Sequence, residues 1–300
     1  MVENIVLQNT LTKARLSLSK VNTPDYILDV VDWGAIESTH HSFKYVNQIG
    51  AYVTSTSLET RTIDVSGWII ADTEAQMTNR KMMLNSFVNP KQAIDLFYKD
   101  YSITFLPNTS IRYSATIAEN NEVICKFKID GVCPDPLFAE KKENRIDAAN
   151  TVGMFHFPLI ISKEPDPPGG IVFGYRRPSL IVGVRNSGAV DVGMTILFKA
   201  KGTVENPSLI NVHTQDFIKI NKTLEAGEQI KVNTTTGSKK IIGIKNGIEH
   251  NYFKYRDLES EWLQLKVGDN LFRYDADNNI NNLEVFIYFK NRFLEVQQCY

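Results

Sequence analysis

The 300-residue sequence predicts a mainly β protein of two domains, the first of which contains one α-helix. Two observations support this prediction. Within residues 61–130, apolar and polar residues alternate with the two-residue period of β-strands, and only one segment has helical spacing instead. From residue 178 onward, short alternating segments are separated by turn residues about every 8–12 positions, which is typical of a two-sheet β-sandwich.

The first domain is organised around a long strand followed by a helix. The apolar face of the predicted strand 61–70 comprises Ile63, Val65 and Ile69. After it, Thr73 offers a helix N-cap, and Gln76 three residues later completes a weak capping box. The predicted apolar side of the helix comprises Met77, Met83, Leu84, Phe87 and Val88, and Asn89-Pro90 ends it.

Further strands are predicted on both sides of this pair. The segments before it are 5–8, 14–19 and 26–33, and the segments after it are 93–98, 101–105, 111–117 and 123–129. Asn120-Asn121 suits a tight hairpin because asparagine tolerates positive φ. Cys125 lies on the apolar face of the last strand and is predicted to be a small buried hydrophobe. Pro134 and Pro136 end the unit, because proline cannot donate to a ladder.

Residues 34–50 break this regular pattern. The segment is polar and weakly periodic, and it contains Phe43 and Tyr45. A loop of this length inside a compact domain is uncommon and is usually functional or bound to a partner. An irregular surface loop and a partner-binding segment both remain open.

Composition excludes several classes of protein. A hydrophobic fraction of 43% fills two cores, and a net charge of −1 argues against binding of nucleic acid by charge alone. Three cysteines, Cys125, Cys133 and Cys299, do not make a disulfide framework. The sequence shows neither a signal peptide nor an apolar run of the roughly 18 residues that a spanning helix requires. We therefore expect that the protein does not associate with membranes and that it folds in a reducing cytoplasm.

The sequence displays no pattern for catalysis, cofactor binding or metal binding. It has no Gly-x-Ser-x-Gly elbow, no phosphate-binding glycine loop, no His-Glu-x-x-His and no Cys-x-x-Cys. His40 and His41 point to opposite faces of an extended chain, which does not suit one metal ion. The segment 275–279 resembles the start of a calcium loop but has Ile280 and Phe286 where glycine and glutamate are needed. We expect a non-enzymatic protein.

The order of elements resembles a known family. Long strand, single helix, meander and Pro-Asp-Pro stop resemble the N-terminal domain of siphophage distal tail proteins. The segments 224–230 (Leu-Glu-Ala-Gly-Glu-Gln-Ile), 262–265 (Trp-Leu-Gln-Leu) and 268–274 (Gly-Asp-Asn-Leu-Phe-Arg-Tyr) resemble the galectin-like C-terminal domain of the same proteins. The resemblance implies a tail-tube-like β domain at 1–138, a connector at 139–177 and a galectin-like, jelly-roll β-sandwich at 178–300.

The resemblance also implies a function and partners. A hexameric ring of this chain would join the tail tube protein to the tail-tip or tail-associated lysin-like protein at the virion tail tip. DNA would pass through the ring without being specifically bound, and receptor-binding proteins would dock on the outer domains. The protein would be made in the cytoplasm of the bacterial host.

Two kinds of contact residue are predicted. In the resembling family an extension like residues 34–50 reaches a neighbouring subunit, so Phe43 and Tyr45 are the candidate subunit contacts. The alternative function is a carbohydrate-binding module for a bacterial surface glycan, in which Trp262 would stack on the sugar or would equally be core.

Overall fold

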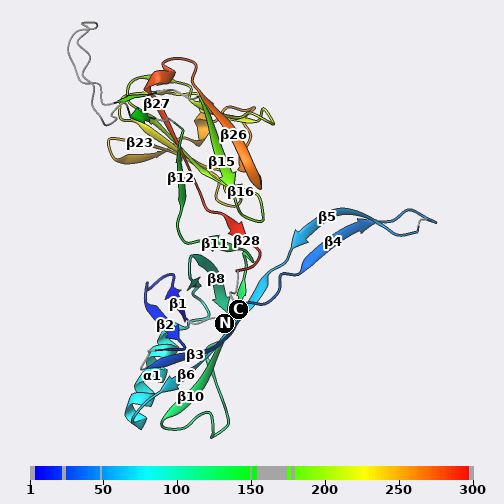
Figure 1. Ribbon diagram of the computed structural model, residues 1–300, viewed down its shortest axis with the longest axis vertical. Helices are drawn as coiled ribbons and strands as arrows, with labels where there is room; N and C mark the ends of the chain where they lie inside the picture. Colours follow the sequence, from blue (N-terminus) through cyan, green and yellow to red (C-terminus); the bar gives the residue numbers. More distant parts are fainter. Residues whose placement is uncertain are drawn as a thin grey trace, which may run out of the picture. The chain divides into compact units, whose positions relative to one another are not determined.

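The computed structural model describes residues 4–21, 25–47, 49–148, 151–153, 174–176 and 180–296, with the backbone alone for 151–153 and 174–176. The chain forms two compact units. The first runs to Lys142 and also includes the segment from Arg292, and the second is Glu143–Asn291. Both are built from β-strands, which confirms the predicted mainly β class (Figure 1). No helix in the described part of the chain is both long and apolar enough to cross a bilayer.

The first unit contains a ten-stranded sheet that closes into a barrel. Its strands are β1 (Asn4–Asn9), β2 (Arg15–Ser19), β3 (Tyr26–Asp32), β6 (Arg61–Ile70), β7 (Ile94–Tyr98), β8 (Tyr101–Pro107), β9 (Arg112–Tyr113), β10 (Ile124–Cys133), β11 (Phe138–Glu140) and β28 (Arg292–Phe293). Their order is β28-β11-β8-β7-β1-β2-β3-β6-β10-β9, and β8 also pairs with β10. This additional pairing closes the barrel, so that its central strands have no free edge.

The barrel closes at a glycine. Gly131 of β10 lies opposite Pro107, and Val132 lies opposite Leu106. A Cβ atom on Gly131 would lie 2.4 Å from the ring of Phe105 and 2.6 Å from the carbonyl oxygen of Leu106. The close approach of β10 to β8 therefore requires a residue without a side chain at this position.

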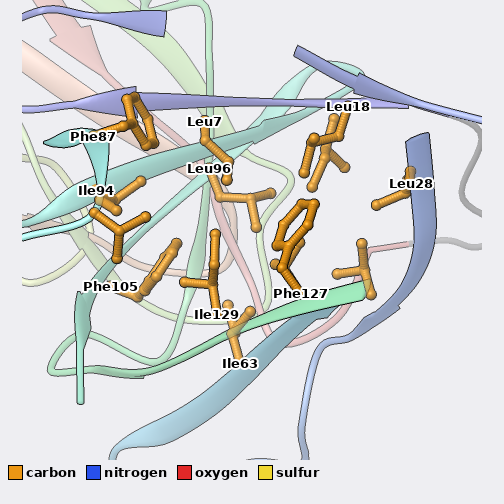
Figure 2. Packing of buried hydrophobic residues seen from close by; sticks show 14 of the residues in the cluster. Leu7, Leu18, Leu28, Ile63, Phe87, Ile94, Leu96, Phe105, Phe127 and Ile129 are labelled. Atoms are coloured by element: carbon orange, nitrogen blue, oxygen red, sulfur yellow. The ribbon is translucent and has the colours of Figure 1, made fainter. Parts of the chain in front are cut away.

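Alternate residues of the strands fill the barrel. Ile63, Val65 and Ile69 of β6 are fully buried, as their spacing predicts, and so is Cys125. Figure 2 shows that apolar side chains from several strands meet in the interior of the barrel. The labelled members are Leu7, Leu18, Leu28, Ile63, Phe87, Ile94, Leu96, Phe105, Phe127 and Ile129. Most of the core of this unit is therefore aliphatic and aromatic.

Helix α1 (Glu74–Phe87) follows β6 as predicted. The Thr73 hydroxyl accepts a hydrogen bond from the Gln76 backbone N–H at 3.3 Å, and the Gln76 side chain accepts one from the Asp72 N–H at 3.0 Å. Of the predicted apolar side, Met77, Leu84 and Phe87 are buried. Met83 was wrongly included, because its side chain faces solvent.

The C-terminal segment returns to the barrel. β28 pairs with β11, the ring of Phe293 lies 5.4 Å from that of Tyr101, and Val296 is buried in the barrel core. The fully buried Arg61 donates hydrogen bonds to the Leu294 carbonyl and, at 3.1 Å, to the Glu295 carboxylate. The barrel unit is therefore assembled from both ends of the chain. In the sequence, the second unit is inserted between the barrel strands β11 and β28.

The second unit is a β-sandwich. One sheet has the order β12-β27-β17-β22-β23-β24 and the other β15-β26-β19-β20, with short two-stranded pairings beside them. The strands are β12 (Asn144–Asp147), β15 (Ile181–Asn186), β16 (Val192–Gly193), β17 (Thr195–Ala200), β18 (Val204–Glu205), β19 (Ser208–Asn211), β20 (Phe217–Lys219), β21 (Thr223–Leu224), β22 (Gln229–Asn233), β23 (Lys240–Lys245), β24 (Ile248–Asn251), β25 (Gln264–Leu265), β26 (Gly268–Asp275) and β27 (Leu283–Phe289). Asn246 and Gly247, both with positive φ, form the predicted hairpin turn between β23 and β24.

The observed division of the chain differs from the predicted one. The predicted connector 139–177 begins inside β11, and β12 within it pairs with β27 of the sandwich. A short pair of strands, β13 (Thr151–Gly153) and β14 (Gly174–Arg176), also falls within it. The proline-rich stretch 162–170, predicted to be a stiff linker, lies outside the described residues. At the C-terminal end, the segment from Arg292 groups with the barrel because β28 pairs with β11.

Candidate assembly surfaces

A two-stranded hairpin extends from the barrel. β4 (Ser38–Phe43) and β5 (Tyr52–Leu58) pair with each other and with no other described strand (Figure 1). We call residues 38–58 the arm. The segment 34–50 was predicted to be a loop, whereas the structure places a strand in it and a second strand directly after it. The sequence of β5, Tyr-Val-Thr-Ser-Thr-Ser-Leu, is rich in β-branched residues, and this was the signal that could have identified it.

The root of the arm is fixed to the barrel. Gly34 has φ of 60°, and a Cβ atom there would lie 2.1 Å from the Thr62 carbonyl oxygen. Its N–H donates to the Asp32 carboxylate at 3.0 Å. The N–H of Glu59 donates to the Glu37 carbonyl at 2.8 Å, so the two strands leave the barrel already paired. The direction of the arm at its root is therefore defined by backbone contacts.

Within the arm, side-chain contacts are polar near the root. The His40 imidazole Nδ1 lies 2.9 Å from the Thr56 hydroxyl. The register shifts between His41 and Ser42, and the Thr54 hydroxyl donates to the His41 carbonyl at 2.9 Å. This bulge increases the local twist of the hairpin.

The end of the arm is apolar and faces solvent. All six residues of β4 and all seven of β5 are exposed. The rings of Phe43 and Tyr45, the predicted subunit contacts, meet edge to face with their centroids 4.6 Å apart. The other exposed apolar residues of this arm tip are Val46, Ile49, Tyr52 and Val53. The structure thus brings the two predicted residues together on an unburied apolar surface, and their contact with another subunit stays a prediction.

Trp262, the predicted glycan contact, lies in the second unit and is partly buried against its core. The Lys239 ammonium lies 5.5 Å and the Arg256 guanidinium 5.7 Å from the centroid of its ring. Phe253 lies 5.9 Å from it in a tilted arrangement. Because two cations already lie over this ring, a sugar would have to displace the exposed Lys239 before stacking there.

A buried carboxylate lies elsewhere in the second unit. Glu228 accepts hydrogen bonds from the Tyr252 hydroxyl at 2.8 Å and from the Glu225 N–H at 3.2 Å, and the Lys222 ammonium lies 3.0 Å away. Burial raises the pKa of Glu228, but the hydrogen bonds from Lys222, Glu225 and Tyr252 outweigh it and lower the pKa below its ordinary value. This carboxylate is satisfied within the fold, which is typical of a structural role.

The histidines, cysteines and carboxylates of the described residues form no group of three or more that would hold a metal ion. In the calcium-like segment, the Asp277 carboxylate binds the Lys219 ammonium at 2.8 Å and the Asn206 amide at 2.8 Å. The Asn278 amide donates to Glu205 at 2.6 Å. These contacts make the segment a polar turn.

Two protein-family models match the chain. Residues 20–116 match the phage tail protein RIFT-related domain, and residues 187–293 match the siphovirus-type tail component, C-terminal domain. Both halves thus match one kind of protein in the predicted order. The chain belongs to the siphovirus distal tail (Dit) family.

Solved structures share the fold of this chain. The crystal structure of the Dit protein of phage SPP1, described as a paradigm of the hub adsorption apparatus in phages that infect Gram-positive bacteria, is 13% identical. It covers 96% of this chain and 99% of that chain, with a TM-score of 0.65. A chain of the phage P2 baseplate in its activated conformation with calcium is 12% identical, covers 97% and 98%, and has a TM-score of 0.50. A search of curated proteins found no match.

The family confirms the coarse prediction. The protein is a structural component of a long-tailed phage tail, with a barrel followed in sequence by a sandwich. The family is a structural one, which agrees with the expectation of a non-enzymatic role.

Proposed function

We propose that the protein is the ring-forming adapter of the tail tip. Six copies would join the tail tube protein to the tail-tip or tail-associated lysin-like protein, and DNA would pass through the ring. The sandwich units would offer docking surfaces to receptor-binding proteins. The similar solved structures, one described as a hub of an adsorption apparatus and the other as a baseplate, support this proposal.

The exposed arm is the observation that carries the proposal. A lone two-stranded hairpin is marginally stable in water, and here neither of its faces is covered by the described part of its own chain. The arm tip also holds six large apolar side chains in solvent. Burial against a neighbouring copy would stabilise the hairpin and cover these side chains.

The reach of the arm fits such a contact. The paired part of the arm has six residues on one strand, which extend about 20 Å at about 3.3 Å per residue. A compact unit of roughly 140 residues has a radius of gyration of about 14 Å and is thus about 35–40 Å across. The arm with its connecting turn therefore spans much of the surface of an adjacent barrel.

Charge is consistent with a conduit. Binding that depends on phosphate neutralisation needs an excess of lysine and arginine, whereas this chain has a net charge of −1. Six copies of such a chain would not hold DNA tightly by charge. DNA would then slide through the ring instead of binding to it.

The ring is tested by the mass of the purified protein. We expect light scattering to give six times the 34.0 kDa chain, about 204 kDa, and negative-stain images to show rings. In the arm-deleted variant, Asn-Gly replaces residues 38–58 and links Glu37 to Glu59, whose backbones are already hydrogen-bonded. This variant should be monomeric with an unchanged circular dichroism spectrum of its two units. A full chain that stays monomeric at 100 µM, or a ring that survives the deletion, contradicts the proposal.

A second candidate function is recognition of a bacterial surface glycan by the sandwich. A hollow of about 260 Å³ lies on the six-stranded sheet. It is lined by the aromatic Tyr288, by the apolar Leu197 and Ile244, and by the polar residues Glu143, Thr195, Gln229 and Lys231. The Arg145 guanidinium lies 6.0 Å from the centroid of the Tyr288 ring, so a sugar would share this ring with a cation. An aromatic surface beside several polar groups is the arrangement that sugars require.

Glycan binding is tested on an array of bacterial surface polysaccharides. If the hollow binds sugar, Tyr288→Ala abolishes the signal and Trp262→Ala retains it. If Trp262 is the contact, Trp262→Ala abolishes the signal and Tyr288→Ala retains it. The absence of any signal from the full chain, at monomer and at ring concentrations, rejects this second function.

A further inference from the structure

The turn before β10 is built by side-chain hydrogen bonds. We call residues 114–123 the rim loop. The Asn120 amide donates to the Ser114 carbonyl at 2.9 Å and accepts from the Lys81 ammonium of α1 at 2.8 Å. The Asn121 side chain accepts from the N–H groups of Val123 and Ile124, both at 2.9 Å. The rim loop is thus fixed internally and to the helix, and its conformation does not depend on a hydrophobic core.

This fixed loop presents apolar side chains to solvent. Ile117 is 85% exposed and Val123 is 54% exposed. Both line a shallow hollow of about 560 Å³, together with the segment 120–124. Because the hydrogen bonds hold the loop in place, these side chains cannot bury themselves by collapse of the loop. They form a pre-organised surface, so the binding of a partner costs little conformational entropy of the loop.

The rim loop and the arm lie at opposite ends of one strand. β6 begins at Arg61, two residues after the arm root at Glu59, and ends at Ile70. The next residue, Ala71, donates its N–H to the Val123 carbonyl of the rim loop at 2.8 Å. At about 3.3 Å per residue, the ten residues of β6 separate the two ends by about 30 Å. One barrel therefore carries the arm at one end and the rim loop at the other, as a head-to-tail contact requires.

The charges of the two surfaces are complementary. Apart from its two histidines, the arm has one ionisable cation, Lys44, and no carboxylate. The rim loop has two carboxylates, Glu119 and Glu122, and no cation. Glu119 accepts hydrogen bonds from the hydroxyls of Ser114 at 2.7 Å and Thr116 at 3.3 Å, and the Lys126 ammonium lies 3.9 Å from it, so its charge is partly balanced within the barrel. Glu122 is exposed and makes no ion pair within the described residues.

We infer that the rim loop is the acceptor for the arm tip of a second copy of this chain. The aromatic pair Phe43 and Tyr45 packs on Ile117 and Val123, and Lys44 faces Glu122. This assignment rests on the proposed ring and adds to it the surface that receives each arm. A heterologous contact of this kind closes into a ring when the rotation between copies divides a full turn.

Engineered disulfides test the assignment. In a Cys299→Ser background, the remaining Cys125 and Cys133 are buried and unreactive. Tyr45→Cys and Ile117→Cys are made in separate chains and then mixed under mild oxidation, and a covalent dimer is expected only from the mixture. The chain that carries both substitutions should give a covalent ladder up to six copies. A matched control replaces Ile117→Cys with Leu11→Cys, at an exposed turn outside the rim loop, and should give at least tenfold less dimer.

Charge exchange gives a second measurement that leaves the apolar contact in place. Lys44→Glu should weaken self-association about tenfold, and Glu122→Lys in the same chain should restore it. Ile117→Asp should abolish the ring, whereas Leu11→Asp should not. If the rim-loop variants keep the ring while arm deletion abolishes it, the acceptor is overturned and the adapter ring stands. If arm deletion also leaves the mass unchanged, both are overturned.

Discussion

β5 and β6 are separated by only two residues, yet they are opposite kinds of strand. Along β6, buried residues alternate with half-buried or exposed ones, and the strand pairs with β3 on one side and β10 on the other. Along β5 all seven residues are exposed, and β4 is its single described partner. Pairing alone defines both as strands, but only β6 gains stability from burial within this chain. In the proposed ring, contacts between copies would stabilise the arm, whereas the barrel is stabilised by burial within a single chain.

The largest expected contrast is between two phenylalanines. Phe105→Ala removes a fully buried ring from the barrel core and should lower the free energy of unfolding by about 3–5 kcal/mol. Phe43→Ala removes a half-exposed ring from the arm and should change barrel stability by less than about 0.5 kcal/mol. Urea unfolding of dilute protein, followed by the fluorescence of Trp33 and Trp68 in a Trp262→Phe background, measures both. Equal losses in the two variants would break the comparison.

The second contrast concerns two glycines in strands. Gly131→Ala places a Cβ atom 2.4 Å from the Phe105 ring where the barrel closes, so it should cost about 2–3 kcal/mol. Gly183→Ala, where the nearest atom lies 3.8 Å away, should stay within about 0.5 kcal/mol of the parent. Thermal unfolding scans compare the two. A tolerated Gly131→Ala would show that the barrel does not depend on close approach of β8 and β10.

A smaller effect on stability is expected at Glu228. This carboxylate has its hydrogen-bond partners within the same chain, whereas the apolar side chains of the arm tip are exposed. Its pKa is lowered in the folded state, so it contributes stability above the unfolded pKa of about 4.3, and this stability is lost as pH falls through the folded pKa. Glu228→Gln should therefore cost about 1–2 kcal/mol at pH 7 and progressively less toward pH 3. Urea midpoints at several pH values measure this, with the exposed Glu249→Gln as control. A pH-independent cost would contradict the role given to the charge.

The barrel strands could be predicted because burial leaves a period of two in the sequence, as at Ile63, Val65 and Ile69. The same rule failed where burial was absent. Residues 111–117 alternate as a strand would, but only β9 forms, because Ser114 and Asn120 satisfy local backbone groups and compete with the ladder. β5 was missed for the converse reason, since it is a strand without an apolar face.

Long-range pairing was the other part that the sequence could not reveal. The return of Phe293 and Val296 to the barrel depends on β11, more than 150 residues earlier. No local periodicity encodes such a partner. The candidate contacts Phe43 and Tyr45 were found because aromatic residues in a polar segment stand out. The rim loop was predicted instead as the end of a strand followed by a tight hairpin at Asn120-Asn121.

Hydrogen exchange of the arm amides tests most directly whether a neighbouring copy completes the arm. The account predicts that amides of β4 and β5 exchange rapidly in dilute monomer and are protected at least tenfold at concentrations where the ring forms, while β6 amides are protected in both. Arm amides that exchange at the same rate in monomer and ring would contradict it.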